Sequence, residues 1–407
     1  MPYAKRGTLG PMATVILKPG HVQPVWAGHP WVYEQAVLRV EGGARAGDEV
    51  SVVDPRGNFL GRGFYSPGSA IVVRVLARER EMPLDAAFFR SRIDRAIAKR
   101  RTFGLPSEET NAFRLVNAEG DDLPGLMVDL FDDVAVLQFG TAGMKQREGM
   151  ILQAIDELVG PRAIIDRTSS NAAKREGFDC GEGVVHGDGS VSALSFVERG
   201  LRFDLPLSLC QKTGFYFDQR PLRERVEQLA KGCRVLDAFS YVGTFALAAA
   251  RGGADEVVAV DESALALEVG AECARLNGLA GRIQYVRSDA KEKMTQAGRQ
   301  GGFDLVLCDP PKFSPTRGAR ASAGVAYQRL AAAACRATRP GGLLALCSCS
   351  AALGLSALTR ASALGARDAN VRATVVERFF QGVDHPVPAA FPEGLYLSSL
   401  LALVEPL

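Results

Sequence analysis

The chain has 407 residues, of which 47% are apolar and 23% are charged, and its formal net charge is only +2. That length exceeds what one ordinary core organises, so we expect two or three domains. Because the net charge is small, a nucleic-acid partner cannot be inferred from the charge of the whole chain and must be argued from local basic patches.

No apolar run approaches the roughly 18 residues of a membrane span, and the first residues lack the long apolar core of a secretory signal. We therefore expect a cytoplasmic protein that does not bind membranes. The eight cysteines form no CxxC pair and have no Cys/His spacing suited to zinc, which predicts reduced thiols and no metal site.

Residues 13–80 contain short apolar runs broken by Gly, Pro and Asn, which predict a small β-barrel. Residues 81–200 predict a small α+β domain with helices at 85–103 and 149–158, two strands within 113–139 and a strand at 163–166. A predicted hairpin at 196–203 leads onward from this domain. The first helix carries Arg90, Arg92, Arg95, Lys99, Arg100 and Arg101. We interpret this basic run as a solvated helix face, with an RNA contact as the alternative.

Strands and helices alternate from Cys233 onward, which predicts a doubly wound, mostly parallel sheet within a domain at 201–407. The strand-like runs are 234–237, 256–261, 283–287, 304–308, 343–347, 374–379 and 395–403. No obvious helix joins the last two runs, so we expect an antiparallel terminal pair. An α/β sheet of this kind is the Rossmann-like architecture of class I methyltransferases.

A cofactor site is predicted at the carboxyl ends of these strands, where open α/β sheets bind ligands. Gly243 lies in the turn after the first strand and would allow a ligand to approach the backbone. Asp237, Asp261 and Asp289 stand at three consecutive strand ends. Asp261 would accept both ribose hydroxyls and Asp289 an adenine amino hydrogen. Each could instead cap a helix, but all three in order, followed by Asp309, favour S-adenosylmethionine.

The segment Asp309-Pro310-Pro311 predicts a rigid loop, because two prolines fix φ and remove two N–H donors. Lys312 follows at the position where amine-methylating enzymes usually carry an aromatic residue, and it could meet a phosphate or a base oxygen. Phe313 comes next. Methylation of an exocyclic amine is therefore the weaker interpretation.

Cys349 is the candidate nucleophile, because it ends the strand that follows the strand of Asp309. A thiolate that adds to C6 of a pyrimidine makes C5 nucleophilic enough to be methylated, which is covalent catalysis. Cys347 is the second candidate, and two buried inert thiols are the alternative; Cys308 is assigned to the core. His385 and Glu393 are candidates for proton removal or cytosine N3 recognition, with a structural turn as an equally good interpretation.

The chain resembles the bacterial large-subunit rRNA methyltransferases with an N-terminal PUA domain, the RlmI-like group that forms 5-methylcytosine. The matching segments span nearly the whole chain: 28–33, 61–67, 123–129, 211–220, 239–241, 309–313, 348–350, 384–386 and 392–397. The resemblance implies a PUA domain at 13–80, a central α+β domain at 81–200, and a methyltransferase domain at 201–407.

The resemblance also implies roles for particular residues. Cys349 is the nucleophile, S-adenosylmethionine is the donor, and 23S rRNA is the partner. The second catalytic residue, Asp309, would hold the base or its amino group. Phe239, Ser240, Tyr241 and Asp309 join the cofactor site. Substrate contacts fall to Lys212, Phe215, Asp218, Gln219, Arg220, Lys312 and Phe313. Lys312 stands where many cytosine-C5 enzymes have a second cysteine, and residues 325–330 depart from the family's usual pattern.

Three hypotheses follow. The leading one is an S-adenosylmethionine-dependent rRNA cytosine-C5 methyltransferase that uses covalent cysteine catalysis. The second is an RNA methyltransferase that acts at another atom without covalent attack. The third is a non-catalytic RNA-binding ribosome-assembly factor. The target nucleotide, the choice between naked rRNA and an assembled subunit, and the oligomeric state, including a homodimer, stay open.

Overall fold

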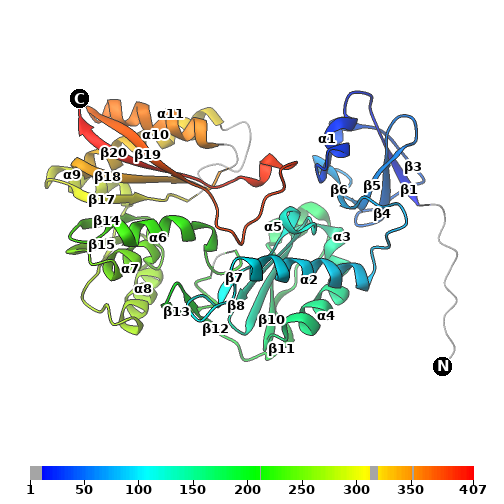
Figure 1. Ribbon diagram of the computed structural model, residues 1–407, viewed down its shortest axis with the longest axis horizontal. Coiled ribbons are helices and arrows are strands. Elements are labelled where there is room, and N and C mark those ends of the chain that lie inside the picture. The colour runs from blue at the N-terminus through cyan, green and yellow to red at the C-terminus, as the bar shows by residue number, and fades with distance from the viewer. Residues whose placement is uncertain (1–11, 211, 312–319, 351–352) are drawn as a thin grey trace. The chain divides into compact units, whose positions relative to one another are not determined.

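The structure, a computed structural model, describes residues 12–210, 212–311, 320–350 and 353–407 (Figure 1). It divides into two compact units. Unit 1 comprises Met1–Ser192, Gln211–Phe215 and Asp384–Gly394, and unit 2 comprises Ala193–Cys210, Tyr216–Val383 and Leu395–Leu407. Two short segments therefore pack in unit 1 although unit 2 surrounds them in sequence.

The first part of unit 1 is a six-stranded sheet in the order β2-β6-β5-β4-β1-β3. Its elements are β1 Ala13–Leu17, α1 Val22–Trp26, β2 Trp31–Tyr33, η1 Glu34–Ala36, β3 Val37–Glu41, β4 Glu49–Val53, β5 Phe59–Tyr65 and β6 Ile71–Ala77. The β1–β4 pair is parallel and the other pairs are antiparallel. Alternate side chains such as Val15, Val52 and Val73 form its buried core.

The second part of unit 1 is a five-stranded sheet in the order β11-β10-β9-β8-β7. Its elements are α2 Ala86–Thr102, β7 Ala112–Asn117, η2 Ala118–Asp121, β8 Leu126–Phe131, β9 Val134–Phe139, α3 Ala142–Lys145, α4 Glu148–Val159, β10 Ala163–Arg167, α5 Ser170–Glu176 and β11 Glu182–Gly187. The two predicted helices are confirmed as α2, which Asp85 caps, and α4. The expected pair of strands within 113–139 is three strands, because a tight turn with Asp132 at φ +54° separates β8 from β9.

The basic residues of α2 bind acids of unit 1. Arg92 lies 3.0 Å from Asp122, Lys99 lies 2.8 Å from Asp121, and Arg100, whose side chain is 1% exposed, lies 2.6 Å from Asp121. These acids lie in and directly after η2, so pairing within the unit neutralises much of the predicted patch. The alternative of an RNA contact through this run loses its main support.

Unit 2 contains a seven-stranded sheet in the order β16-β15-β14-β17-β18-β20-β19 and a separate hairpin, β12-β13. Its strands are β12 Ala193–Glu198, β13 Leu201–Pro206, β14 Arg234–Ala238, β15 Glu256–Asp261, β16 Gln284–Arg287, β17 Phe303–Cys308, β18 Thr338–Ser348, β19 Val371–Phe379 and β20 Ser398–Pro406. Strands β14 to β18 pair in parallel, whereas β20 is antiparallel to both β18 and β19. The predicted doubly wound sheet with an antiparallel terminal pair is confirmed.

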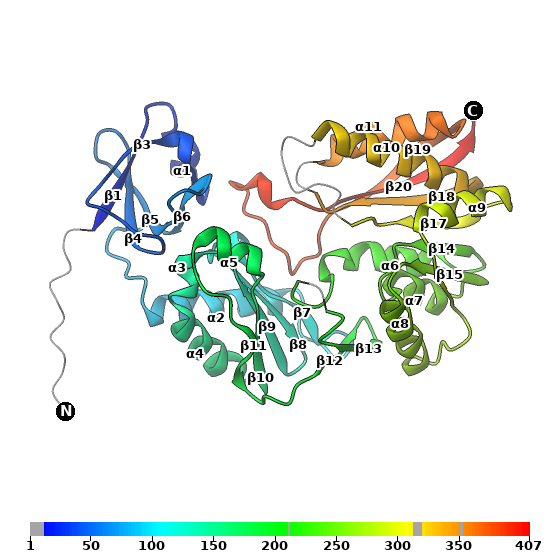
Figure 2. The ribbon, with the colours of Figure 1, turned by 180° about the vertical axis from the view of Figure 1, so that it is seen from behind.

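Helices cover both faces of this sheet. They are α6 Arg220–Leu229, α7 Thr244–Arg251, α8 Ala264–Leu276, α9 Ala290–Arg299, α10 Arg320–Ala337 and α11 Leu355–Asp368, with the short turns η3 Phe217–Gln219 and η5 Pro392–Gly394. Figures 1 and 2 show α6, α7 and α8 on one face and α9, α10 and α11 on the other. Such two-sided burial explains why residues 305–308 of β17 are all apolar. Cys308 lies in this core, as predicted.

Among the helices of the described ranges, none is long and apolar enough to cross a membrane.

Candidate active site

The strand order of unit 2 gathers the predicted site residues at one edge of the sheet. Strands β15, β14, β17 and β18 are successive neighbours. Asp261 ends β15, Asp237 is the penultimate residue of β14, Asp309 follows β17, and Cys349 follows β18. Because parallel strands end at a common edge, three carboxylates and a thiol stand side by side there, where α/β sheets bind ligands.

The turn between β14 and α7 has an unusual backbone. Phe239 and Tyr241 adopt left-handed φ values of +66° and +53°, which side-chain-bearing residues rarely do. The Ser240 N–H donates to the Val260 carbonyl at 2.9 Å. The Tyr241 N–H donates to Asp261 Oδ2, also at 2.9 Å. Strained turns of this kind persist only where surrounding contacts hold them, and they concentrate at functional sites.

Gly243 has a structural reason to be glycine. Its φ is +76°, and a Cβ atom there would lie 3.1 Å from Tyr285 Cε1. The Tyr285 hydroxyl is fixed by a 2.7 Å hydrogen bond that it donates to the Gly270 carbonyl. A left-handed turn packed on a fixed ring therefore accounts for the glycine without the ligand approach that the sequence suggested.

Asp237 lies beneath this turn and is 1% exposed. Its Oδ2 accepts a 3.0 Å hydrogen bond from the Ala246 N–H in α7. Asp237 Oδ1 and Ser240 Oγ are buried and have no hydrogen-bond partner among the residues that the structure describes. Burial raises the pKa of Asp237 to about 7, and the negative charges of Asp309 and Asp261 add to the rise. The hydrogen bond from the Ala246 N–H acts in the opposite direction and lowers it.

The other two predicted cofactor acids differ from each other. Asp261 binds two backbone amides, those of Tyr241 and Ser263, and so organises the turn. Asp289 is exposed and caps α9 through a 2.7 Å hydrogen bond from the Glu292 N–H. The helix-capping alternative therefore describes Asp289, and its contact with an adenine stays a prediction. Phe239 packs against the core of unit 2.

Asp309 is half-buried and accepts a 2.9 Å hydrogen bond from Gln219 Nε2. Beside it lies Tyr216, which was not among the predicted site residues. Burial raises the pKa of Tyr216 to about 12, and the charges of Asp309, Asp218 and Cys349 add to the rise. The sequence signal that could have found Tyr216 is its position between Phe215 and Asp218, which were both assigned to the substrate.

The two candidate thiols have different environments. Cys347 is 1% exposed, and burial raises its pKa well above the usual value, which leaves it inert. Cys349 is half-buried at the strand end. Charge interactions link it to Tyr216 and to Tyr327 of α10, both of which also interact with Asp309. Of the two thiols, Cys349 is therefore the accessible one beside Asp309.

The predicted substrate residues divide between the two units. Lys212 and Phe215 belong to unit 1, where the Lys212 carbonyl accepts a hydrogen bond from Arg167. Asp218, Gln219 and Arg220 belong to unit 2. Lys312 and Phe313 lie outside the described residues.

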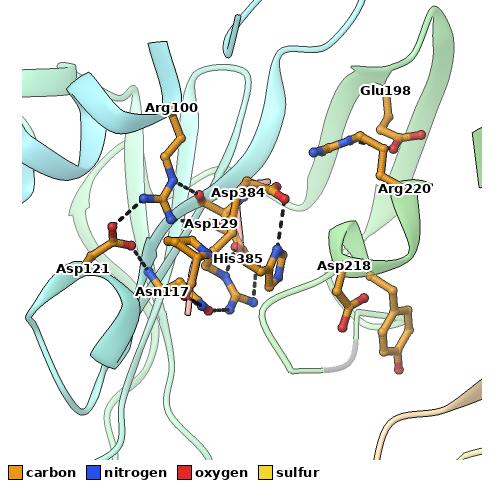
Figure 3. A network of polar contacts seen from close by, with 12 residues as sticks. Arg100, Asn117, Asp121, Asp129, Glu198, Asp218, Arg220, Asp384 and His385 are labelled. Atoms are coloured by element: carbon orange, nitrogen blue, oxygen red, sulfur yellow. Dashed lines mark hydrogen bonds and ion pairs between the residues drawn. The ribbon is translucent and has the colours of Figure 1, made fainter. Parts of the chain in front are cut away.

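Arg220 of unit 2 takes part in a buried ion cluster. It lies 3.0 Å from Glu198, and Arg223 lies 2.8 Å from the same carboxylate. Figure 3 shows the Glu198 and Arg220 side chains next to each other. Burial alone would raise the pKa of Glu198, but Arg223 and Arg220 together hold it below its usual value. Arg220 is thus engaged by a protein carboxylate.

His385 and Glu393 both pack in unit 1. His385 is buried, with Nδ1 3.0 Å from Asp384 Oδ1, and the Asp384 carbonyl accepts a hydrogen bond from Arg100 (Figure 3). The Glu393 carboxylate lies 3.2 Å from His29 Nε2 and accepts a 3.3 Å hydrogen bond from the Tyr33 hydroxyl. These contacts favour the structural interpretation of both segments.

A family model for S-adenosylmethionine-dependent methyltransferases matches residues 178–394, more than half of the chain. The chain belongs to this family. A second model, for a PUA-like domain, matches residues 15–78 of the methyltransferase and confirms the predicted N-terminal domain type.

The methyltransferase is similar over nearly its whole length to curated proteins named ribosomal RNA large subunit methyltransferase I. It is 36% identical over 394 residues to the one from Alteromonas mediterranea, which covers 96% of this chain and 99% of that protein. It is 34% identical over 392 residues to one from Yersinia pestis, with the same coverage.

Solved structures share the fold. A SAM-dependent methyltransferase structure from Streptococcus mutans has a TM-score of 0.83 at 20% identity, covering 96% of this chain and all of that one. A methyltransferase structure complexed with SAH has a TM-score of 0.84 at 20% identity, with the same coverage. The predicted Rossmann-like class is confirmed.

S-adenosylmethionine is thus the methyl donor of the family, as predicted, and the residues present fit it. The ligand carries a cationic sulfonium, an ammonium group and ribose hydroxyls. Three adjacent carboxylates suit positive charge, and the buried Asp237 Oδ1 and Ser240 Oγ suit a polar ligand. A dinucleotide would instead need a glycine-rich nest for its pyrophosphate, whereas residues 238–243 offer a single glycine.

Proposed function

We propose that this methyltransferase acts on large-subunit ribosomal RNA and forms 5-methylcytosine through a covalent bond to Cys349. The relatives named above support the RNA class, because they match almost the full chain. The observation that carries the chemistry is the contrast between the two thiols. Cys347 is sealed in the core, whereas Cys349 lies half-buried beside Asp309.

The proposed reaction assigns one task to each group. The Cys349 thiolate adds to C6 of the cytosine, and the electron pair of the C5–C6 double bond moves toward C5. The bound cofactor supplies an electrophilic methyl group at C5. Loss of the C5 proton to a base then reforms the double bond and expels Cys349, so the enzyme returns unchanged.

Asp309 is proposed to hold the base or its exocyclic amino group. Its carboxylate accepts from Gln219 through Oδ2, and a carboxylate has capacity for further donors. Asp237, Ser240, Tyr241, Gly243 and Asp261 are proposed to hold the cofactor around the β14–α7 turn. Asp289 is proposed to contact its adenine. The PUA-like segment is proposed as the RNA platform, with a central domain at 81–200 and the catalytic domain from 201.

Replacement of the nucleophile tests the proposal. Cys349→Ala should lower single-turnover methyl transfer by about 10⁴-fold or more, because the pyrimidine C5 is not activated without the thiolate. Binding of S-adenosylmethionine, measured by calorimetry, should change less than about twofold. Cys233→Ala is the control, since Cys233 is also a half-buried thiol of unit 2 but lies at the opposite end of β14. Full methyl transfer by Cys349→Ala would remove the covalent role.

A chemical trap separates covalent from non-covalent methylation. RNA that carries 5-fluorocytosine cannot lose a C5 proton, so the enzyme should stay bound to it through Cys349. Peptide mass mapping should find the adduct on this cysteine. Methylated product without an adduct would instead indicate transfer to another atom of the RNA. No methyl transfer and no S-adenosylmethionine binding would favour the non-catalytic assembly factor.

A further inference from the structure

Gln219 has contacts that its predicted substrate role does not explain. The residue is 4% exposed. Its Nε2 donates to Asp309 Oδ2 at 2.9 Å. A buried amide that donates to Asp309, directly after β17, is directed at the protein.

We propose that Gln219 is a positioning residue that sets the orientation of the Asp309 carboxylate for methyl transfer. The torsion that turns a carboxylate is broad and roughly twofold, so a fixed donor is needed to select one orientation. The Gln219 amide supplies that donor from outside the sheet, because residues 217–219 form the turn η3. The inference rests on the proposed role of Asp309.

The residue before Gln219 is itself held from two directions. The Asp218 carbonyl accepts a 3.1 Å hydrogen bond from the Gly382 N–H, and Asp218 Oδ2 accepts a 2.7 Å hydrogen bond from the Tyr396 hydroxyl. Gly382 follows β19 and Tyr396 precedes β20. The position of Gln219 is therefore tied to both strands of the antiparallel terminal pair.

The start of η3 is held from below by a buried ion pair. Arg223 Nη1 donates to the Tyr216 carbonyl at 2.8 Å, and Nη2 donates to Glu198 Oε1, also at 2.8 Å. Both side chains of this pair are at most 2% exposed. Glu198, the last residue of β12, thus acts through Arg223 to fix the backbone at Tyr216, three residues before Gln219.

These anchors make Gln219 a preorganised donor. Its Oε1 is buried without a hydrogen-bond partner among the described residues. Holding the side chain in this place therefore costs the free energy of an unsatisfied buried acceptor. A glutamate at this position would put a second carboxylate against Asp309. The structure therefore explains an amide, and not merely any polar group, at residue 219.

The test is a double-mutant cycle with Gln219→Ala and Asp309→Asn, measured as total methyl transfer in single turnovers. We expect Gln219→Ala to lower the rate by about 10- to 100-fold, as for other residues that orient a reacting group. The KM for RNA and the dissociation constant of S-adenosylmethionine should change less than about threefold. In the Asp309→Asn background, Gln219→Ala should cost less than about twofold.

The positioning role would be overturned if the rate losses of Gln219→Ala and Asp309→Asn simply multiplied in the double variant. It would also be overturned if Gln219→Ala kept the rate but raised the KM for RNA about tenfold, which would indicate a substrate contact. Gln228→Ala is the matched control, because Gln228 is an exposed glutamine of α6 that contacts Arg225. It should keep the parent rate. Thermal unfolding of each variant identifies any that are misfolded, and Gln219→Asn, which keeps the amide but not its reach, then replaces Gln219→Ala.

A second measurement does not need turnover. The side-chain amide protons of Gln219 should exchange slowly with solvent in the nitrogen-15 NMR spectrum, and their shifts should move in Asp309→Asn. Fast exchange of these amide protons, or chemical shifts that do not change in Asp309→Asn, would contradict the hydrogen bond between Gln219 and Asp309. Both readouts hold whichever atom of the RNA is methylated. A failed cytosine-C5 assignment would therefore appear separately, as methylated RNA without 5-methylcytosine.

Discussion

At the scale of single residues, Asp237 combines deep burial with a pKa near neutrality. Its carboxyl has one hydrogen-bond donor, the Ala246 N–H, and two neighbouring carboxylates, Asp309 and Asp261. A cationic ligand is the natural counterpart of such a group, because it favours the ionised form. Perturbed carboxyls of this kind concentrate at functional sites.

The affinity for S-adenosylmethionine should therefore rise with pH. The free protein holds a proton on Asp237 below about pH 7, and a cationic ligand must displace it. Between about pH 6 and 7.5 the ionised fraction, and with it the association constant, should rise about eightfold. Calorimetry in two buffers should show proton release on binding. Asp237→Asn should flatten the pH dependence, whereas Asp289→Asn should retain it; a flat wild-type profile would contradict the assignment.

The same carboxyl affects the stability of the ligand-free protein with a defined sign. The native pKa lies above the ordinary value of 3.8, so between the two values the native state binds more protons than the unfolded state. The contribution of Asp237 to stability is therefore most favourable below about pH 4 and is lost as the pH rises toward about 7. Cofactor binding reverses this loss by stabilising the ionised form.

At the scale of elements, the β14–α7 turn is held by its neighbours rather than by its own sequence. Val260 and Asp261 of β15 accept its amides, and Tyr285 of β16 packs on Gly243. The strand runs themselves were predictable, because buried parallel strands are continuously apolar. The left-handed backbone at Phe239 and Tyr241 was not, since no side-chain pattern marks it.

Gly243→Ala should destabilise the protein more than an alanine at an uncrowded left-handed glycine. Both Gly243 and Gly278 have positive φ, at +76° and +68°, but a Cβ at Gly278 meets nothing within 4 Å. Gly278→Ala should cost about 1 kcal/mol from the backbone alone. Gly243→Ala should cost about 2 to 3 kcal/mol, because the Tyr285 ring must also shift. Urea unfolding measures both; equal costs would show that Tyr285 does not constrain the turn.

The part of the site that sequence reasoning missed lies where distant segments meet. Tyr216 was not predicted as a site residue, because core packing is the simplest interpretation of an aromatic residue between Phe215 and Phe217. The acids that pair with the basic run of α2 come after the next strand, β7, in the sequence. Only the fold brings Asp121 next to Arg100. The order of Asp237, Asp261, Asp309 and Cys349 along the chain was informative, since strand ends of a doubly wound sheet share one edge.

At the scale of the whole molecule, residues 384–394 connect two strands of unit 2 but pack in unit 1. The Phe391 ring contacts Trp31 of β2 with centroids 4.5 Å apart, and the Asp384 carbonyl accepts a 2.8 Å hydrogen bond from Arg100. Their partners lie hundreds of residues earlier in the chain. A linear reading of domain boundaries cannot reveal such an exchange, because each contact is defined only after both partners have folded.

Phe391→Ala should therefore destabilise unit 1 although it lies near the C-terminus. Removing this buried ring from Trp31 and His29 should cost about 3 kcal/mol or more. Hydrogen exchange should accelerate in β2, and β14 and β17 of unit 2 should keep their protection. Phe380→Ala is the control, since Phe380 is 39% exposed in unit 2. Uniform loss of protection across both units would show that they unfold together.

The position of β20 has a consequence for biosynthesis. It is the last strand of the sequence, yet it lies between β18 and β19, and the chain must cross residues 384–394 to reach it. Until β20 has been synthesised, β18 and β19 have no strand between them. The seven-stranded sheet can therefore be completed only after residues 398–406 have left the ribosome, whereas most of unit 1 can fold earlier.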